Sequence, residues 1–297
     1  MRKPAIRPAI FLLACLVARI GSAQEHPASG IVLSIDAAHR SLTISCAEIP
    51  GYMGAMDMTF AVGEGTRIES LKPGTAVTFT IAQRRKTEGG KTLYAENIQL
   101  RPTANLESEP LQAGQLTALH KALNPAAVTS ELAVGQPVPD FQLTDQAGTL
   151  IRLSQFQGKA VVLTFGYSRC PNPTYCFRLS NNLAIVERRF PQRAGRDFVL
   201  MTIAIDPEHD QGEALARFAG TWKANPEVWH FLTGPLPEVH RIAGLFGMNF
   251  WSEEGLITHS LHTVILDRQG RLAVNLQGNA FTSEQLGDLL RTVLDRR

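Results

Sequence analysis

The sequence has no apolar run long enough to cross a membrane as a helix, and it has no large excess of charge of either sign. Lysine and arginine total 29 and aspartate and glutamate total 27 among 297 residues, so the formal net charge is +2. A spanning helix needs about 20 apolar residues, and nucleic-acid binding needs clustered lysine and arginine. The composition therefore argues against a nucleic-acid-binding protein and against a transmembrane span in the mature chain.

A leader-like segment opens the chain. It reads MRKPAIRPAIFLLACLVARIGSAQ, in which basic residues precede ten apolar residues at 9–18 and small residues stand at 21 and 23. This order is typical of a secretory signal peptide, here residues 1–23, and it indicates export to the periplasm. Cys15 lies in a stretch that resembles a lipobox, so lipid anchoring through Cys15, with association to a membrane, is the alternative.

Cysteine is scarce. The chain has four cysteines, and removal of the leader with Cys15 leaves Cys46, Cys170 and Cys176. An odd number allows at most one internal disulfide, so at least one thiol of the exported protein is free, reactive or bound to a metal. The cysteine count therefore points to thiol or metal chemistry.

Short alternating segments from residue 27 to residue 102 predict a small all-β domain. Ile31, Leu33 and Ile35 alternate with their neighbours, and turn signals such as Pro73-Gly74 separate about five strands. A sheet of this size buries enough apolar surface only if it closes. We therefore expect a small OB-like barrel, followed at 103–134 by a linker in which the alternation is lost.

Residues 135–297 show a different pattern, in which apolar strand-like runs alternate with amphipathic helical stripes. The strand-like runs lie at 160–165, 198–205 and 264–266. One of the helical stripes lies at 282–293, where Thr282 and Gln285 form a capping box. This alternation predicts an α/β domain with a buried sheet. The fold class expected for the whole chain is thus two-domain, an all-β barrel followed by an α/β unit.

A pair of cysteines follows the first buried run of the second domain. Cys170 and Cys176 lie between a strand that ends at Phe165 and an amphipathic helix, which is a thioredoxin-like arrangement. Asn172 and Pro173 are expected as the N-cap and first residue of that helix. Cys176 then lies in the first helical turn, where the helix dipole favours a thiolate. The loop alone leaves redox activity, metal binding and a structural disulfide open.

The stretch PDFQLTDQAGTLIRLSQFQGKAVVLTFGYSRCP resembles the opening of the Sco/SenC-type copper chaperones. These are exported thioredoxin-fold proteins associated with copper delivery to cytochrome oxidase, and the resemblance covers about residues 134–297. It implies copper ligands at Cys170, Cys176 and His259, with Asp206 as a supporting residue. The loop CPNPTYC departs from the family pattern, because five residues separate its cysteines where the family usually has three.

The residues around His259 favour a metal over redox catalysis. A thioredoxin carries a proline that faces its cysteines, whereas the segment 258–260 reads Thr-His-Ser and places an imidazole there. Two thiolates and an imidazole form a ligand set that suits copper. His262 is expected on the opposite face of the strand by the period of two, and it is the second choice for the imidazole ligand. Either histidine is alternatively a hydrogen-bonded core residue.

Methionine is also scarce, yet three of the six methionines fall between residues 53 and 58. Thioethers are soft ligands that select Cu(I), and Met56 and Met58 share one face of a strand; core filling is the alternative. The stretch resembles the CusF-type periplasmic copper and silver carriers, small β-barrels, over about residues 29–100. The resemblance matches their MxM pair to Met56 and Met58. The chain departs from these carriers at two positions, because Cys46 stands where they have histidine and Met53 stands where they have tryptophan. We therefore expect a Cu(I) site of one thiol and three thioethers, softer than the usual one.

These patterns together predict an exported metallochaperone that holds and delivers copper. The expected acceptor is a cytochrome oxidase subunit with a copper centre, and the expected cofactor or cargo is copper. Two other functions stay open. One is a thiol–disulfide oxidoreductase that acts through Cys170 and Cys176, and the other is a periplasmic copper-tolerance buffer.

Overall fold

The computed structural model of the chain describes residues 25–85, 91–101, 131–172, 174–253 and 255–296. The predicted signal peptide (1–23), Cys15, Pro173 and most of the predicted linker (103–130) fall outside these residues. Within the described part of the chain, no helix is both long enough and apolar enough to cross a membrane.

Five strands in the N-terminal part close into a barrel in the order β1-β2-β3-β5-β4. They are β1 (His26–Asp36), β2 (Ser41–Cys46), β3 (Met56–Val62), β4 (Ala76–Arg85) and β5 (Lys91–Leu100). Neighbouring strands run antiparallel except for β3 and β5, which are parallel. Val32, Phe60 and Val77 are fully buried in the barrel interior. The sheet is thus closed, as its small size requires.

The C-terminal part is built on a seven-stranded sheet in the order β14-β13-β8-β9-β10-β6-β7. Its strands are β6 (Gln142–Asp145), β7 (Leu150–Arg152), β8 (Ala160–Gly166), β9 (Phe198–Ala204), β10 (Trp229–Thr233), β13 (His262–Leu266) and β14 (Leu272–Gln277). The central strands β8, β9 and β10 are parallel, and their apolar sequences are buried on both faces. A separate hairpin of β11 (Phe250–Glu253) and β12 (Leu256–His259) stands beside this sheet.

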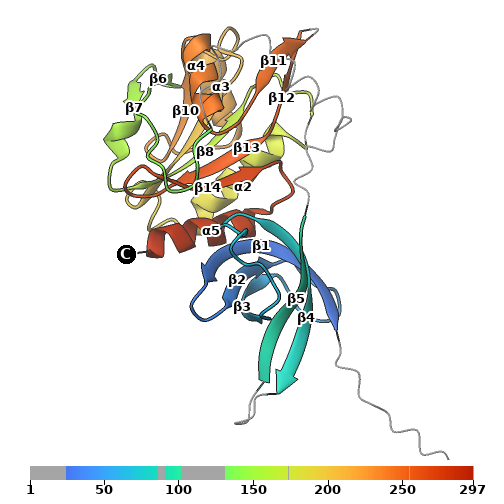
Figure 1. The fold of residues 1–297 in the computed structure, drawn as a ribbon. Coiled ribbons are helices and arrows are strands. Elements are labelled where there is room, and N and C mark those ends of the chain that lie inside the picture. Colours follow the sequence, from blue (N-terminus) through green and yellow to red (C-terminus); the bar gives the residue numbers. More distant parts are fainter. Residues whose placement is uncertain (1–24, 86–90, 102–130, 173, 254, 297) are drawn as a thin grey trace, which may run out of the picture.

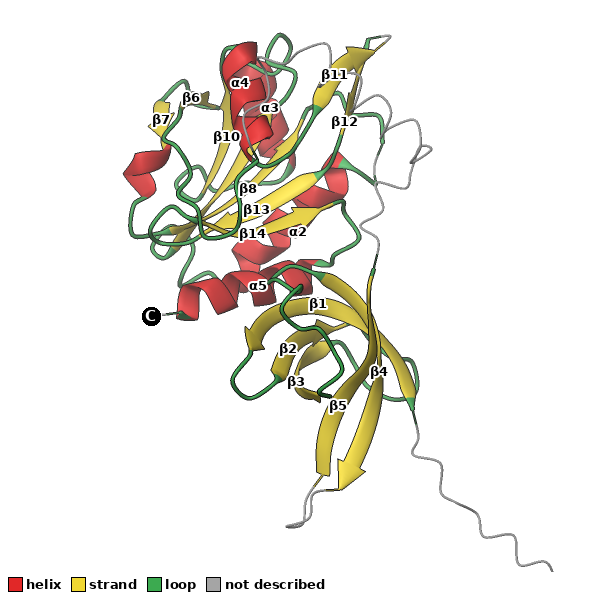
Figure 2. Cartoon of the chain, in the orientation of Figure 1, coloured by secondary structure: helices red, strands yellow, loops and turns green. Residues whose placement is uncertain are grey.

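Helices cover both faces of this sheet, as Figure 2 shows. The apolar side chains of α2 (Cys176–Arg189), α3 (Gly212–Thr221) and α5 (Ser283–Asp295) pack on one face, and those of α4 (Leu236–Leu245) pack on the other. A short 3-10 helix, η2 (Leu153–Phe156), follows β7. The capping box predicted for the last helix is present, because the Thr282 side chain accepts from the Gln285 N–H and the Gln285 side chain accepts from the Thr282 N–H.

The start of α2 differs from the prediction. The helix begins at Cys176 with Tyr175 as its N-cap, whereas Asn172 and Pro173 were expected to begin it. The Asn172 side chain instead accepts hydrogen bonds from the backbone N–H and the hydroxyl of Thr174. Asn172 therefore caps a local turn before the helix. Cys176 is still at the first helical position, where backbone N–H groups have no partner within the helix.

The barrel is seated on α5, which lies between the barrel and the C-terminal sheet (Figure 1). Ile31 and Leu33 of β1 belong to the same buried apolar cluster as Leu286 and Leu290 of α5. Val32, between them, points into the barrel interior. The alternation in β1 thus marks a strand that is buried on both faces, with the outer face covered by the second domain.

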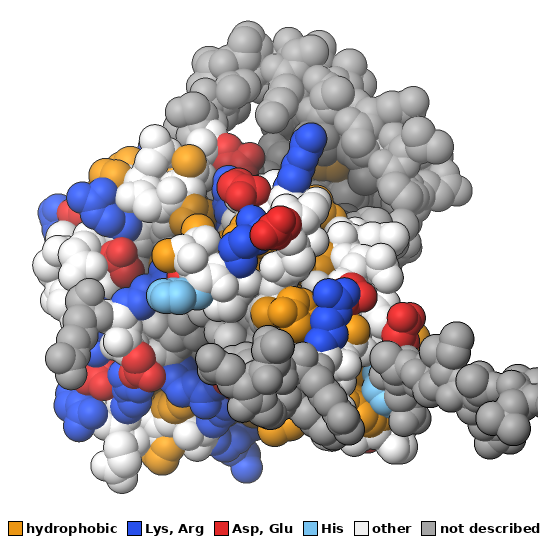
Figure 3. Space-filling model, turned by 60° about the horizontal axis from the view of Figure 1, so that its bottom comes forward, with side chains coloured by type: hydrophobic (Ala, Val, Ile, Leu, Met, Phe, Trp, Pro, Cys, Tyr) orange, Lys and Arg blue, Asp and Glu red, His pale blue; other side chains and the backbone are white. Residues whose placement is uncertain are grey.

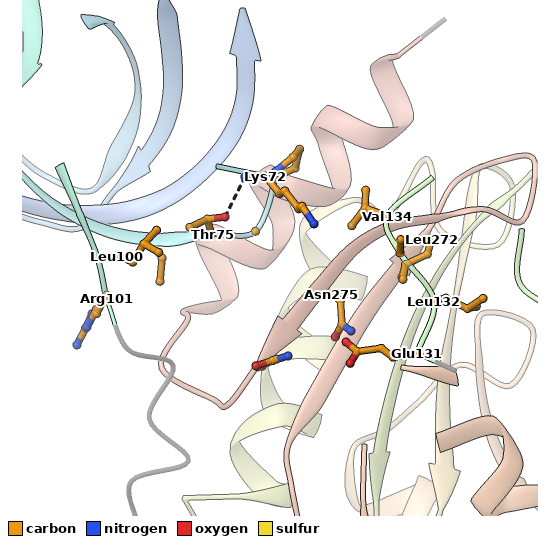
Figure 4. Close-up of a pocket in the computed structure, with 14 residues that line it drawn as sticks. Lys72, Thr75, Leu100, Arg101, Glu131, Leu132, Val134, Leu272 and Asn275 are labelled. Carbon is orange, nitrogen blue, oxygen red and sulfur yellow. Dashed lines mark hydrogen bonds between the residues drawn. The ribbon is translucent and has the colours of Figure 1, made fainter. Parts of the chain in front are cut away.

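A second contact joins the barrel to β14. Gly74, with φ of +91°, lies so close to β14 that a Cβ atom there would come within 2.7 Å of Val274 Cγ1. Beside this contact, a hollow of about 480 Å³ separates Lys72, Leu100 and Arg101 of the barrel from residues 131–134 and 272–277 (Figure 4). Residues 131–134, assigned by sequence to the linker, bond to the C-terminal domain, because Leu132 N–H donates to Leu245 O.

The face seen in Figure 3 carries lysine and arginine side chains interspersed with aspartate and glutamate. Such a surface lacks the broad basic field that attracts nucleic acid. The mixed charge on this face agrees with the near-neutral composition of the chain.

Candidate metal centre

The loop between β8 and α2 carries both cysteines of the predicted site. Both are buried free thiols, with 7% of Cys170 and 1% of Cys176 exposed. Cys176 lies against the end of β8, where a Cβ atom on Gly166 would be 3.7 Å from its Sγ atom. The strand end and the first helical turn therefore fix Cys176, while Cys170 lies on the intervening loop.

The segment 206–210 after β9 braces this loop from one side. The Ser168 N–H and hydroxyl both donate to the Asp210 carboxylate, and the Arg169 guanidinium donates to Asp206 at 2.6 Å. Asp206, which the family resemblance implies as a supporting residue, contacts the loop through Arg169. His209 Nδ1 also lies 2.8 Å from Asp206 Oδ1. These bonds hold the two residues that immediately precede Cys170.

A third element, the hairpin β11–β12, brings His259 to the cysteines. His259 Nε2 lies 3.8 Å from Cys176 Sγ. The other ring nitrogen, Nδ1, lies 3.0 Å from Ser260 O, and because a carbonyl only accepts, Nδ1 carries the proton. With Nδ1 bonded to the backbone, Nε2 faces the Cys176 sulfur, which is the orientation that metal-binding histidines need.

Backbone contacts hold the imidazole in this place. Ser260 N–H donates to Asn249 O at 2.9 Å, and Asn249 N–H donates to Ser260 Oγ at 3.0 Å. The ring of Tyr167 meets the His259 ring edge to face, with centroids 5.9 Å apart. The position of His259 is thus set by a strand, a bracing serine and an aromatic neighbour.

The separation of sulfur and nitrogen fits a shared metal ion. An ion bonded at about 2.3 Å to a thiolate and at about 2.0 Å to an imidazole, the lengths usual at zinc centres, would hold the two ligand atoms about 3.5–3.8 Å apart. The observed 3.8 Å falls in this range. Across the described ranges, however, no three cysteine, histidine, aspartate or glutamate side chains are arranged to hold a metal together. A three-ligand site therefore requires a rearrangement of these side chains when the metal binds.

The two thiols differ in their acidity. A hydrogen bond from the Cys176 thiol holds the pKa of Cys170 well below its usual range, although burial opposes this. A second hydrogen bond, from His259, acts in the same direction. The same bond, together with burial, raises the pKa of Cys176. Burial and the charge of Cys170 raise the pKa of Tyr167 to about 12, so its phenol stays protonated. Cys170 is therefore the thiolate of the pair at neutral pH.

The second-choice ligand, His262, does not join the cluster. It lies on β13, is buried, and its Nδ1 atom is 3.0 Å from Asn275 Oδ1. Burial lowers the pKa of His262 to about 4, so the ring is neutral. His262 has the contacts of a hydrogen-bonded core residue, which was the alternative considered for it.

The barrel residues proposed as ligands lie at one end of the barrel. Cys46 is paired directly across the antiparallel ladder with Met56, and Ile44 is paired with Met58. These four side chains share the inner face of β2 and β3. Met53 lies in the loop between the two strands, in an isolated bridge with Ile49. The strand register therefore places the thiol beside the Met56 thioether, with the Met58 thioether two residues further along β3.

The barrel ligands differ in burial. Cys46 is 1% exposed and its thiol lies 3.7 Å from Ile44 O, whereas Met56 is 53% exposed. Burial, with a smaller contribution from the charge of Asp57, raises the pKa of Cys46 to about 12. The structure thus shows Cys46 as a protonated thiol that faces the barrel interior, and a metal shared with Met56 requires its sulfur to turn outward.

Sequence reasoning missed several residues around both sites. The loop partners Ser168, Arg169 and Asp210 gave no local pattern, because their contacts span about forty residues. At the barrel end, the Tyr52 ring stacks on His26 with centroids 3.6 Å apart. Tyr52 directly precedes Met53, so an aromatic ring remains near the position where the CusF-type carriers have tryptophan.

Comparison with known families covers both parts of the chain. Residues 130–295 match the family model described as SCO1/SenC, and residues 25–92 match the model described as copper binding periplasmic protein CusF. The first match covers more than half of the chain and includes the cysteine loop and His259. The second covers the barrel strands from β1 to the start of β5.

Individual relatives match the C-terminal part. The human mitochondrial protein SCO2 homolog is 29% identical over 168 residues, which are 54% of this chain and 60% of that protein. Protein sco1 of Schizosaccharomyces pombe is 27% identical over 156 residues, 49% of this chain and 56% of that protein. The chain thus spans less than two thirds of these curated relatives. The crystal structure of Arabidopsis thaliana ScoI with copper bound is 22% identical, with a TM-score of 0.47, over 55% of this chain and 100% of that one.

Proposed function

Because the chain belongs to the SCO1/SenC family, we propose that it is an exported copper chaperone in which Cys170, Cys176 and His259 hold copper in transit. The observation that carries this proposal is the approach of His259 Nε2 to within 3.8 Å of Cys176 Sγ, with the opposite ring nitrogen bonded to Ser260 O. Two thiols and an oriented imidazole meet here from three separate elements. Apolar residues would fill the same buried space at a lower desolvation cost, so packing alone does not explain these side chains.

The ligand set suits a metal that is taken up and released. Thiolates hold Cu(I), and the imidazole also accommodates Cu(II). Cys170 is the thiolate of the pair and lies on a loop, so it is the ligand that closes on copper and that an acceptor displaces first. Copper then leaves by exchange of one sulfur ligand at a time, without a change in its oxidation state.

The barrel holds copper at a second place in the same chain, through Cys46, Met53, Met56 and Met58. The match of residues 25–92 to the copper-binding CusF family supports this assignment, as does the direct pairing of Cys46 with Met56. One thiol and three thioethers make a softer set than the C-terminal one, so Cu(I) is the form that the barrel holds.

The acceptor of copper is the copper centre of a cytochrome oxidase subunit in the periplasm. This assignment rests on the resemblance to the Sco/SenC chaperones. It is coherent with a thiol-based site whose labile ligand, Cys170, is 7% exposed while the copper-anchoring Cys176 is 1% exposed.

Copper binding by variants that keep only the C-terminal candidate site tests the proposal. Cu(I) and Cu(II) are titrated into the full mature chain carrying Cys46→Ser, Met56→Leu and Met58→Leu, which silences the barrel, and into the same chain with His259→Ala. We expect one copper per chain in the first protein, and loss of Cu(II) binding with weakened Cu(I) binding in the second. Unchanged binding of both ions after His259→Ala would contradict the proposed centre, and His262→Ala is the matched control.

The opposite pKa shifts of the two thiols favour a second function, a thiol–disulfide oxidoreductase with Cys170 as the attacking thiolate and Cys176 as the resolving thiol. A thiol-exchange assay with a Cu(I) chelator present separates the two functions. Turnover that survives both copper removal and His259→Ala would favour the oxidoreductase. A deletion strain separates copper delivery from copper tolerance. Loss of delivery lowers oxidase activity, whereas loss of a buffer makes growth sensitive to copper and leaves oxidase activity unchanged.

A further inference from the structure

The strands that carry the barrel's proposed copper ligands also carry its contacts with the second domain. Cys46, Met56 and Met58 share the inner face of β2 and β3, and the residues between them point outward. Of these outward residues, Ser45 and Asp57 are cross-strand partners. The ligand face and the docking face are thus opposite sides of the same few residues.

Helix α5 binds both outward residues. The Ser45 hydroxyl donates to Asp288 Oδ2 at 2.7 Å, and Gln285 Nε2 donates to Ser45 O at 3.3 Å. The Arg291 guanidinium donates to Asp57. Asp288, which is 5% exposed, also accepts from Arg189 Nη2 of α2 at 2.6 Å. These bonds hold the cross-strand pair that directly adjoins the Cys46–Met56 pair.

The same helix forms one wall of the space next to the proposed ligands. A hollow of about 440 Å³ lies between the barrel end and the start of α5. Cys46, Ala55 and Met56 line it from the barrel, and Thr282, Gln285 and Asp288 line it from the second domain. A chelator or acceptor that approaches Cys46 and Met56 through this hollow therefore meets α5.

The docked barrel is far from the other proposed site. Arg189, at the last residue of α2, lines the hollow beside Cys46, whereas Cys176 is the first residue of that helix. Thirteen residues of α-helix span about 20 Å. Ligand exchange requires sulfurs from donor and acceptor on one copper ion, so copper in the docked barrel is out of reach of Cys176.

We propose that docking of the barrel on α5 is an autoinhibitory gate that retains Cu(I) in the barrel, and that copper leaves the barrel when this interface opens. The gate rests on the proposed copper-holding role of the barrel. In the closed form α5 restrains β2 and β3, covers one approach to Cys46 and keeps the two copper sites apart. In the open form the Cys46–Met56 end is accessible to a small chelator, to an acceptor or to the Cys170–Cys176 pair.

Release of Cu(I) to a phenanthroline-type chelator tests the gate. All proteins are the full mature chain with Cys170→Ser, Cys176→Ser and His259→Ala, so that copper is held by the barrel alone. Leu33→Glu is the opening variant, because Leu33 lies on the outer face of the barrel and a charge there opposes only the docked state. Gln285→Ala with Arg291→Ala opens the interface from the α5 side. The matched control is Asp295→Asn. Asp295 also lies on α5, but its ion pair is with Arg193 of the C-terminal domain and not with the barrel.

We expect release at least tenfold faster in both opening variants and unchanged in the control, with a larger radius of gyration in solution scattering for the opening variants only. Equal release rates in an opened and a docked protein would overturn the gate, as would a parent protein that scatters as two separate domains. Failure of the parent to bind Cu(I) at the barrel would instead refute the copper-holding role. If Leu33→Glu fails to fold, the α5 variants decide the outcome, since they leave the barrel sequence intact.

Discussion

The two candidate copper sites of this chain are built in different ways. In the barrel, Cys46 and Met56 are neighbours because of strand register, so two adjacent strands place them together. In the C-terminal domain, Cys176 and His259 come from a helix and a hairpin that are 83 residues apart in sequence. The first arrangement is encoded locally, whereas the second depends on the whole fold around β8.

The sites also differ in how ready their thiols are to bind metal. Cys170 receives a hydrogen bond from Cys176 that holds its pKa below the usual range, whereas burial raises the pKa of Cys46 to about 12. A copper ion at the barrel must therefore displace a proton from a buried thiol, while one at the C-terminal cluster meets a thiolate. One chain can therefore offer copper a cysteine sulfur in two states, as a thiolate at Cys170 and as a protonated thiol at Cys46.

Thiol alkylation gives the largest expected contrast. Between pH 6 and pH 7 we expect Cys170 to react with iodoacetamide more than about 1000-fold faster than Cys46, because a thiol of pKa about 12 leaves only about one thiolate in 10⁵ molecules at pH 7. Raising the pH should speed the Cys46 reaction tenfold per unit and leave the Cys170 rate nearly flat. Mass spectrometry of the copper-free protein measures both rates, and similar rates at pH 6 would break the contrast.

Removal of one sulfur from the C-terminal cluster should have the next largest effect. Cys176→Ser replaces a proposed copper ligand that is 1% exposed, so we expect the Cu(I) affinity of that cluster to fall by more than about 100-fold, beyond the loss usual for residues that only support a ligand. A competition titration in the barrel-silenced chain measures it. The barrel-silenced chain, which carries Cys46→Ser, is the control, and its C-terminal cluster should bind Cu(I) as tightly as that of the unaltered chain; an equal loss on silencing the barrel would mean that the sites are not independent.

The barrel thioethers should contribute less individually and more as a pair. Met56→Leu combined with Met58→Leu keeps the side-chain volume but removes both soft ligands, so we expect the Cu(I) affinity of the barrel to fall at least tenfold. Met248→Leu, a core methionine of the other domain, is the matched control. Cu(I) stoichiometry and affinity that remain as in the parent would assign Met56 and Met58 to packing.

The smallest expected effect concerns Ser260. Its hydroxyl accepts the Asn249 N–H and so fixes the strand end that carries His259. Ser260→Ala should weaken copper binding at the C-terminal cluster about tenfold, the lower end for a residue that orients a ligand, with little change in the melting temperature. Ser70→Ala, at a barrel serine that bonds only to a local carbonyl, serves as the control. A loss as large as that of Cys176→Ser would make Ser260 a structural residue of the hairpin.

The period of two in the barrel and the capping box of α5 were readable from sequence because each depends on residues a few positions apart. The alternation in β1 was more ambiguous, since Ile31 and Leu33 face α5 and Val32 faces the barrel interior. Alternation identifies two faces but not which of them meets another domain, and a bulge between Val32 and Ser34 changes the phase along the strand.

Prediction of the copper cluster had a different limit. The cysteine loop and the family resemblance pointed to His259, but the orientation of its ring depends on Ser260 O, a backbone group that no motif records. The bracing of the loop by Asp206 and Asp210 likewise joins segments that no local period relates. The sequence predicted too early a start for α2, because an asparagine side chain accepts the same kind of hydrogen bond in a tight turn as at a helix N-cap. Asn172 forms the turn.

Gly74 gives the barrel a shape that matches its neighbour. Its positive φ and the closeness of Val274 leave no space for a side chain at this turn. A barrel from another carrier with any larger residue at that turn would therefore tilt away from β14 when grafted onto this C-terminal domain. Chimeric proteins made by exchanging the two halves should accordingly be screened at this one turn before their ligands are compared.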